Sequence, residues 1–364
     1  MLNSNDRLET IAHFRMAVEG AMQVVSYAFD QENPRGPVKL QGRLLMPPAP
    51  AYRKMRVAFE QLGYTPHLAP VPDKPDLHEV TIVLGTIPQT PRNPWLNFWL
   101  FLVTVVSVIF TGGYNPDGFK WADGIMFAGS LLSILVVHEA GHYIVGRRRG
   151  APVSLPYFIP MPIVSIIGTM GAVIVQREPF EDRRAMLEIG IAGPLAGFLV
   201  AVPLYIIGLL LSSIQPIPTT GGLLYLGDSL LTYTLGLLTV GRIDPASGRD
   251  VFLHPIAWGA WIGLLITGIN LIPAGQLDGG HIASALLGAR ARYLSWVMIA
   301  ALLAMSLLSQ MWLLWAVMLF LFGRSHPEPL NQSTPIDVQH YALALAGLLV
   351  FILVFVPLPI TVMP

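Results

Sequence analysis

The 364-residue chain contains no cysteine, and this absence excludes several kinds of chemistry. Without thiols there are no disulfides, thiolate metal ligands, cysteine nucleophiles or iron–sulfur clusters. Charge is also scarce, because only 12% of the residues are Asp, Glu, Lys or Arg, against about 25% in soluble proteins. The 22 basic and 22 acidic residues cancel, so the chain lacks the basic excess of a protein that binds nucleic acid. A metal site in this chain has to be built from histidine and carboxylate side chains.

Apolar residues are abundant and unevenly distributed. They make up 53% of the chain, which is far too apolar for a disordered or uniformly soluble protein. The first 92 residues hold 19 charged residues, whereas the remaining 272 hold only 25. We therefore predict a soluble domain over residues 1–92 and a transmembrane domain over residues 93–364.

The first 92 residues predict a small α+β domain. Residues 1–20 are polar and partly acidic, so they resemble neither a signal peptide nor an Arg-rich transit peptide. The domain carries no catalytic motif, and we interpret it as a docking or regulatory module. The expected elements are a helix from about residue 5, strands at 23–29, 38–45 and 81–84, and a helix at 51–62, with proline-rich breaks at 47–50 and 70–75.

Seven apolar segments of the second domain approach the roughly 20 residues that a helix needs to cross a bilayer. We predict a polytopic α-helical membrane protein with six or seven spans, because the fifth and sixth segments are short enough to form a hairpin that does not cross. The segments are residues 95–111, 122–145, 189–213, 256–272, 294–308, 311–322 and 341–356.

Basic residues predict how these spans are oriented. Arginines concentrate in the connection between the second and third spans, and positive residues mark cytoplasmic connections. The connection and the N-terminal domain are therefore expected in the cytoplasm. Without a visible transit peptide, a bacterial plasma membrane is expected rather than a plastid membrane, although a plastid protein that has already been processed would look the same. The arginines are Arg147, Arg148, Arg149, Arg177, Arg183 and Arg184.

The second span ends in the pattern His-Glu-x-x-His at residues 138–142. On a helix His138 and His142 are four residues apart and share one face, so both imidazoles can bind one metal ion. Glu139 lies beside that ion without having to bind it, and can take a proton from a water molecule. Two imidazoles and a carboxylate suit zinc. Three ionisable side chains at membrane depth are costly, which favours a functional role over histidines satisfied by neighbouring helices.

A catalytic zinc ion normally has three protein ligands, and we expect Asp278 to be the third. It follows the fourth span in a segment broken by Pro273, Gly275, Gly279 and Gly280, where the backbone can bend and deliver a carboxylate to a buried site. The alternative role for Asp278 is to cap the helix that begins near Ile282.

Three further polar residues lie around the fourth span. His281 is a rival metal ligand, whereas His254 begins the span and is expected at the membrane interface. Asn270 lies inside the span and can hydrogen-bond a reacting carbonyl or its oxyanion.

These elements resemble the site-2 proteases, a family of intramembrane zinc metalloproteases. The matching motifs are HEAGH at residues 138–142, GIAGPLAG at 190–197 and NLIPAGQLDG at 270–279, within a core of about residues 122–290. The resemblance implies one zinc ion per chain. It also implies that His138, His142 and Asp278 bind this ion, that Glu139 activates water, and that Asn270 stabilises the tetrahedral intermediate.

Within that family the chain is similar to the branch that carries a soluble N-terminal domain. This similarity rests on the stretches at residues 156–160 and 168–172. The connection at residues 213–251 is too short for a PDZ domain, and no CBS-like domain follows the last span. The regulators that other branches carry are therefore not implied.

Residues 151–176 are apolar, rich in proline and β-branched side chains, and have no helical periodicity. We predict a membrane-associated β-hairpin with strands at 164–167 and 171–175 around Gly168. Its free edge can pair with an extended substrate segment, although a hairpin that only fills a gap between spans is the alternative. On the third span, the spacing of Gly190, Gly193 and Gly197 predicts close helix packing.

The leading hypothesis is a zinc-dependent endopeptidase that cleaves single-span or other membrane proteins within or near a transmembrane segment. Its partners are then these substrates and the lipid bilayer, with no nucleic acid; no pattern specifies an oligomeric state. A metal transporter that uses the same His/Asp cluster is the main alternative, and it would use Glu139 as a ligand. A zinc protease that trims prenylated C-termini shares HExxH, but residues 270–279 argue against it. An inactive relative is a further alternative, although every expected catalytic residue is present.

Overall fold

The structure is a computed structural model. It describes residues 4–29, 37–86, 93–115, 118–162, 165–176, 178–217, 223–243, 247–323 and 328–363. The chain divides into two compact units, which are described separately. Unit 1 comprises Met1–Pro91, Arg177–Met186 and Pro327–Asp337, and unit 2 comprises Arg92–Gln176, Leu187–His326 and Val338–Pro364.

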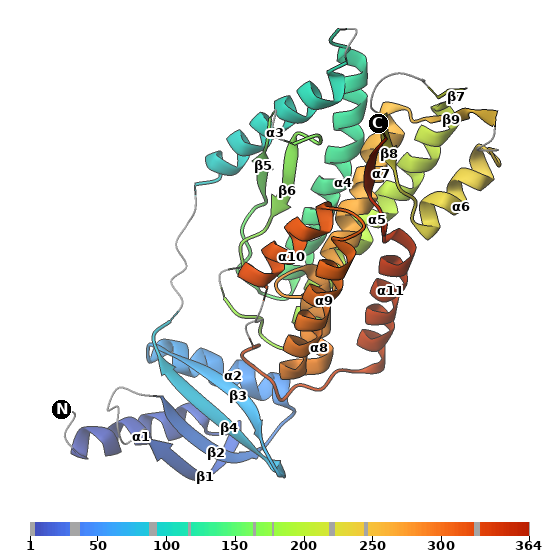
Figure 1. Cartoon of the computed structure of the whole chain (residues 1–364). Coiled ribbons are helices and arrows are strands. Elements are labelled where there is room, and N and C mark those ends of the chain that lie inside the picture. The colour runs from blue at the N-terminus through green and yellow to red at the C-terminus, as the bar shows by residue number, and fades with distance from the viewer. Residues whose placement is uncertain are drawn as a thin grey trace. The chain divides into compact units, whose positions relative to one another are not determined.

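Unit 1 is an α+β structure built on one antiparallel sheet with the strand order β1-β2-β4-β3 (Figure 1). Alternate residues of the strands face the core, as Val80 and Ile82 do on β4, and Tyr52, Met55 and Phe59 bring one face of α2 against them. The elements are α1 (Ser4–Val18), β1 (Met22–Phe29), β2 (Val38–Leu44), α2 (Pro48–Gln61), β3 (Tyr64–Val71) and β4 (Lys74–Leu84).

The predicted helices and strands of unit 1 are present, but the two proline-rich breaks are shorter than predicted: Pro47 and Pro72 lie between elements, and the other prolines lie within them. Pro48 lies at the start of α2, where a missing N–H costs nothing. Pro66 and Pro70 lie in β3, a strand that the sequence analysis missed, and Pro75 lies in β4. Proline is tolerated in β3 because β3 is the last strand in the order β1-β2-β4-β3 and pairs with β4 along one edge. The pairing with β4 also shifts register after Pro70.

Two later stretches of chain extend the sheet of unit 1. The Leu68 N–H donates to the Leu330 carbonyl at 2.8 Å, and the Gln332 N–H donates back to the Leu68 carbonyl at 2.8 Å. The Asn331 N–H donates to the Glu181 carbonyl at 2.8 Å. The Leu330 side chain completes the hydrophobic core. Residues around 181 and 331 therefore belong structurally to the N-terminal sheet.

Unit 2 is helical, and the chain is an integral membrane protein with several candidate spans. Four helical stretches are long and apolar enough to cross a bilayer: Trp95–Gly113, Trp121–Arg148, Arg183–Leu211 and Asp278–Met305, with shorter apolar helices beside them. The elements are α3 (Trp95–Gly113), α4 (Trp121–Arg148), α5 (Arg183–Leu211), α6 (Leu230–Thr239), α7 (Pro255–Asn270), α8 (Asp278–Leu287), the short 3₁₀ helix η2 (Gly288–Arg290), α9 (Ala291–Met305), α10 (Met311–Phe322) and α11 (Val338–Val354).

Helix α4 is central to unit 2, since it packs against both α3 and α7 (Figure 1). Glycines allow this close approach: a Cβ added at Gly259 of α7 would lie 2.8 Å from the Phe127 carbonyl oxygen of α4. The connection after α5 holds the short helix α6 and three strands that take part in two small sheets. One pairs β7 (Ser213–Pro216) with β9 (Arg249–Phe252), and the other pairs β8 (Leu223–Leu226) with β10 (Ile360–Met363).

A β-hairpin follows α4, but one of its strands differs from the prediction. It pairs β5 (Tyr157–Pro160) with β6 (Thr169–Val173), and β5 lies against α3. The predicted strand at residues 164–167 is wrong, because Ser165–Ile167 form the turn and Val164 lies outside the described residues. The Gly168 N–H donates to the Ser165 carbonyl, and Gly168 has a φ of 77°, which glycine adopts without strain.

Candidate metal centre

The predicted pair of histidines lies on one buried face of α4. His138 is 2% exposed and His142 is 8% exposed, and their Nε2 atoms are 3.2 Å apart. One turn of helix separates the two residues, so their imidazoles converge on the same point. Both side chains face the interior of unit 2. A metal ion bound there can take the place of the water molecules that burial has removed from the ring nitrogens.

Asp278 is the third member of the cluster, because the chain turns sharply after α7. Helix α7 ends at Asn270, and Gly275 has a φ of 58° in the turn that follows. A Cβ at Gly279 or Gly280 would overlap the backbone of that same turn, so only glycine fits there. Leu277, not Asp278, is the N-cap of α8, and the Oδ2 atom of Asp278 lies against the two histidines, which argues against the capping role.

The three donor atoms form a nearly equilateral triangle. The Asp278 Oδ2 atom lies 3.2 Å from His138 Nε2 and 3.3 Å from His142 Nε2, and the third side is the 3.2 Å between the imidazoles. Ligand atoms at about 2.0–2.1 Å from a tetrahedral zinc ion lie roughly 3.3 Å from one another. His138, His142 and Asp278 therefore fit a zinc ion with a fourth position left open.

A backbone carbonyl orients His142 within this triangle. Its Nδ1 atom lies 2.7 Å from the carbonyl oxygen of Ile189, on α5. A carbonyl only accepts, so the proton is on Nδ1 and the Nε2 lone pair is free to face a metal.

Glu139 is buried beside the cluster without belonging to it. Its side chain is 5% exposed, and the three-donor group contains His138, His142 and Asp278 but no oxygen of Glu139. Among the described hydrogen bonds and ion pairs, none involves the Glu139 carboxylate. It is therefore available to exchange a proton.

The remaining predicted residues lie outside the described donor group. His281 is on α8 with its Cβ against Gly190, and His254 caps α7 by accepting from the Ile256 N–H at 3.3 Å. Asn270 is the last residue of α7, and the role predicted for it stays a prediction.

Small residues bring α5 onto the histidines. A Cβ at Gly193 would overlap the His142 imidazole, and one at Gly197 would lie 3.2 Å from the Cβ of His138. Gly141 faces the backbone of Ala192 and Gly193 from the other side. The glycine pattern predicted helix packing, but it did not indicate that the packing partners are the side chains of the candidate metal centre.

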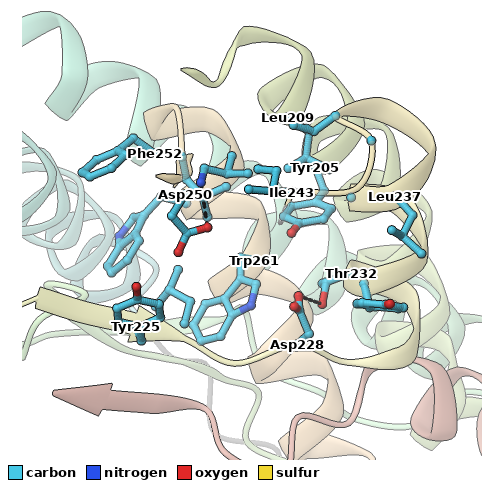
Figure 2. A pocket seen from close by; sticks show the side chains of 18 of the residues that line it. Tyr205, Leu209, Tyr225, Asp228, Thr232, Leu237, Ile243, Asp250, Phe252 and Trp261 are labelled. Atoms are coloured by element: carbon cyan, nitrogen blue, oxygen red, sulfur yellow. Dashed lines mark hydrogen bonds between the residues drawn. The ribbon is translucent and has the colours of Figure 1, made fainter. Parts of the chain in front are cut away.

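A separate cavity of about 570 Å³ lies between the C-terminal end of α5 and the N-terminal end of α7 (Figure 2). These are the ends of the two helices that are farther from the donor triangle. Figure 2 shows aromatic rings and two carboxylates around this cavity. None of the predicted site residues is among the residues that line it. Gly193 and Leu209 are 16 residues apart on α5, which corresponds to roughly 24 Å along the helix. The cavity is therefore distinct from the metal centre. Its lining includes Tyr205, Tyr225, Asp228, Asp250, Phe252 and Trp261.

Comparison with known proteins shows that a family model matches the part of the chain that holds the donor residues. The sequence model of Peptidase family M50 matches residues 126–313, which include all three donor residues. No solved structure matches the chain significantly.

Several plant proteins are similar to the chain. It is 30% identical over 354 residues to a probable zinc metalloprotease of Arabidopsis thaliana, EGY2, chloroplastic, an alignment that covers 92% of this chain and 62% of that protein. It is 31% identical over 239 residues to the EGY2 protein of Oryza sativa subsp. indica, covering 65% of this chain and 43% of that protein. It is 29% identical over 235 residues to EGY1 of Arabidopsis thaliana, covering 62% of this chain and 42% of that protein. The chain thus spans less than two thirds of the length of these relatives.

Proposed function

Since the chain belongs to peptidase family M50, we propose that it is a zinc-dependent intramembrane endopeptidase. The observation that carries this proposal is the buried triangle of donor atoms from His138, His142 and Asp278, with sides of 3.2, 3.2 and 3.3 Å. The names of the relatives, which describe probable zinc metalloproteases, support the same reaction class.

His138, His142 and Asp278 would hold the ion, one per chain. Zinc bound there supplies Lewis acidity, which lowers the pKa of water to about 7 and polarises a carbonyl group. Glu139 takes the proton from the attacking water and returns it to the departing nitrogen, so the peptide C–N bond breaks without a free amide anion. Asn270 donates a hydrogen bond to the oxygen on which negative charge develops.

The substrate is a membrane protein, single-span or otherwise, that is cut within or near a transmembrane segment. The donor triangle is buried in a helical unit that has four candidate spans, which supports a substrate presented from the bilayer. A helix hides its peptide carbonyls, so the cleaved segment has to be extended. We propose that it pairs with a free edge of the β5–β6 hairpin.

We further propose that the chain has six or seven spans and that its N-terminal domain lies in the cytoplasm. The proposed location is a bacterial plasma membrane. Arginines 147–149 at and after the end of α4 support this orientation, because positive residues mark the cytoplasmic side. The names of the relatives reported above describe them as chloroplastic, which differs from the location proposed for this chain.

The test compares zinc content and cleavage in four purified proteins: wild type, His142→Ala, Asp278→Ala and Glu139→Gln. We expect about one zinc ion per chain in wild type and Glu139→Gln, and a loss of zinc in the other two. Cleavage of a single-span reporter peptide, followed by mass spectrometry, should fall by a factor of about 100 or more in Glu139→Gln. Loss of zinc from Glu139→Gln would instead favour the transporter, because Glu139 would then be a ligand.

A further inference from the structure

We propose that Glu188 is a positioning residue for the metal centre. Its carboxylate joins Arg149 at the end of α4 to His340 on α11. These bonds fix the position of α5 along its own axis, so that the Ile189 carbonyl can orient His142. The inference deepens the proposed function, since it assumes a metal ion on His138, His142 and Asp278.

The Glu188 carboxylate has partners on two other helices. Arg149 Nε donates to Glu188 Oε2 at 2.5 Å, and Arg149 Nη2 pairs with Glu188 Oε1, so the guanidinium is bidentate. His340 Nε2 lies 2.9 Å from the same Oε1 atom, and because a carboxylate only accepts, the imidazole donates. His340 is buried, and the three residues are here called the Glu188 clasp.

The clasp is adjacent to the bond that orients His142. Glu188 precedes Ile189, whose carbonyl oxygen lies 2.7 Å from His142 Nδ1. Any movement of Glu188 along the axis of α5 therefore moves this carbonyl as well. The His142 imidazole would then lose the bond that keeps its Nε2 atom in the donor triangle.

The contact between α4 and α5 at the two histidines leaves little space for such movement. Where α5 meets the two histidines it presents Gly193 and Gly197, and α4 presents Gly141 to the backbone of Ala192 and Gly193. Small residues let the two helices approach closely, so a small axial shift of α5 would press its backbone against the imidazoles. A directional, bidentate ion pair can set the axial position that this close fit requires.

The cost of the clasp also favours a specific role. Glu188 lies in the first turns of the candidate span Arg183–Leu211 and its side chain is 23% exposed, so its carboxylate loses most of its water and needs charged partners. A plain stabilising tie between helices would be satisfied by neutral groups, as where the Ser130 hydroxyl of α4 donates to the Ile256 carbonyl of α7 at 2.8 Å.

The experiment measures metal binding by the full-length protein in detergent. Zinc affinity is obtained by competition with a chelating indicator, and the visible spectrum of the cobalt(II)-substituted protein reports the geometry of the ligands. The variants are Glu188→Gln, Arg149→Gln, the double variant and His340→Gln. Ser130→Ala is the matched control, because it removes a tie between α4 and a neighbouring helix away from the metal centre.

We expect Glu188→Gln and Arg149→Gln each to weaken zinc binding about tenfold and to change the cobalt spectrum. The double variant should be no worse than Glu188→Gln alone, because that change has already broken the pair with Arg149. Ser130→Ala should leave affinity and spectrum unchanged. If Glu188→Gln does not fold, His340→Gln, which removes a single arm, decides by the same two measurements.

A Glu188→Gln protein with wild-type affinity and cobalt spectrum would overturn the inference, even if it melts at a lower temperature. Wild-type protein that binds zinc but cleaves nothing would overturn the proposed function alone, and the cobalt comparison would still decide about Glu188. Wild-type protein that binds no zinc would overturn both.

Discussion

Gly193 shows how little space surrounds the candidate metal centre. Alanine is normally preferred to glycine inside a helix by about 1 kcal/mol. At Gly193, however, the added methyl group would overlap the His142 imidazole, including the Nε2 atom of the donor triangle. The absence of a side chain at this residue is therefore part of the site.

We predict that Gly193→Ala weakens zinc binding by a factor of about 10 or more, because the imidazole has to turn or α5 has to move away. Gly129→Ala on α4 is the matched control, since a Cβ there meets nothing within 4 Å. Zinc competition measures both variants. Equal affinities in Gly193→Ala and Gly129→Ala would contradict the close packing of α5 on His142.

At the scale of elements, strand β4 in unit 1 contacts the stretch around residue 331 through a histidine. The Nδ1 atom of His78 lies 2.8 Å from the Ser333 hydroxyl oxygen. Burial lowers the pKa of His78 below its ordinary value. Burial also lowers the pKa of His67 on β3, although the nearby Glu328 carboxylate partly opposes this shift. Both imidazoles are therefore neutral in the folded unit at neutral pH.

This direction predicts that unit 1 loses stability in mild acid. The unfolded chain binds protons near the ordinary histidine pKa of about 6.5, before the folded unit does. The stabilisation is therefore complete above about pH 6.5 and is lost as the pH falls through the lower folded-state pKa values. Amide protection at Leu68 and Gln332, corrected for intrinsic exchange, should fall between pH 7.5 and 5.5.

Variants separate the contribution of His78 from general effects of acid. His78→Gln should flatten the pH dependence in part, whereas His13→Gln, at an exposed position on α1, should leave it unchanged. The explanation fails if His78→Gln and wild type lose protection to the same extent over this range.

At the scale of the whole molecule, unit 1 is assembled from three distant stretches of chain. Asn331 is fully buried where they meet: its Nδ2 atom donates to the Thr334 hydroxyl at 2.7 Å and to the Pro48 carbonyl at 3.4 Å. The Arg56 guanidinium adds an ion pair with Glu178 at 2.6 Å. The two connections that lead into α5 and α11 are thus held by the N-terminal sheet.

We predict that Asn331→Ala lowers the free energy of unfolding of unit 1 by about 1–3 kcal/mol, because buried polar partners lose their hydrogen bonds. The neighbouring Gln332→Ala is the control, since the bond that its side chain makes among the described residues is an exposed one, to Glu328. Hydrogen exchange followed by mass spectrometry should show faster exchange at residues 66–70 and 328–334 in Asn331→Ala. Equal exchange in the two variants would argue against Asn331 as the junction.

The sequence by itself determined the local features. Apolar runs long enough to cross a bilayer indicated the spans, and four-residue spacing brought His138 and His142 together on one helix face. Alternation and helical periodicity predicted most elements of unit 1. Asp278 was also within reach, because the glycines and proline around it mark a break in a buried helix.

Only the tertiary structure decided what depends on residues far apart in the chain. No local pattern relates Leu68 to Asn331, or Arg149 to Glu188 and His340, because these contacts form when separate segments pack. The same reason explains the errors in β3 and β5, where pairing partners outweighed local preference. The division of the chain at residue 92 stays a prediction. The pairing of the N-terminal sheet with residues near 181 and 331 came from tertiary packing alone.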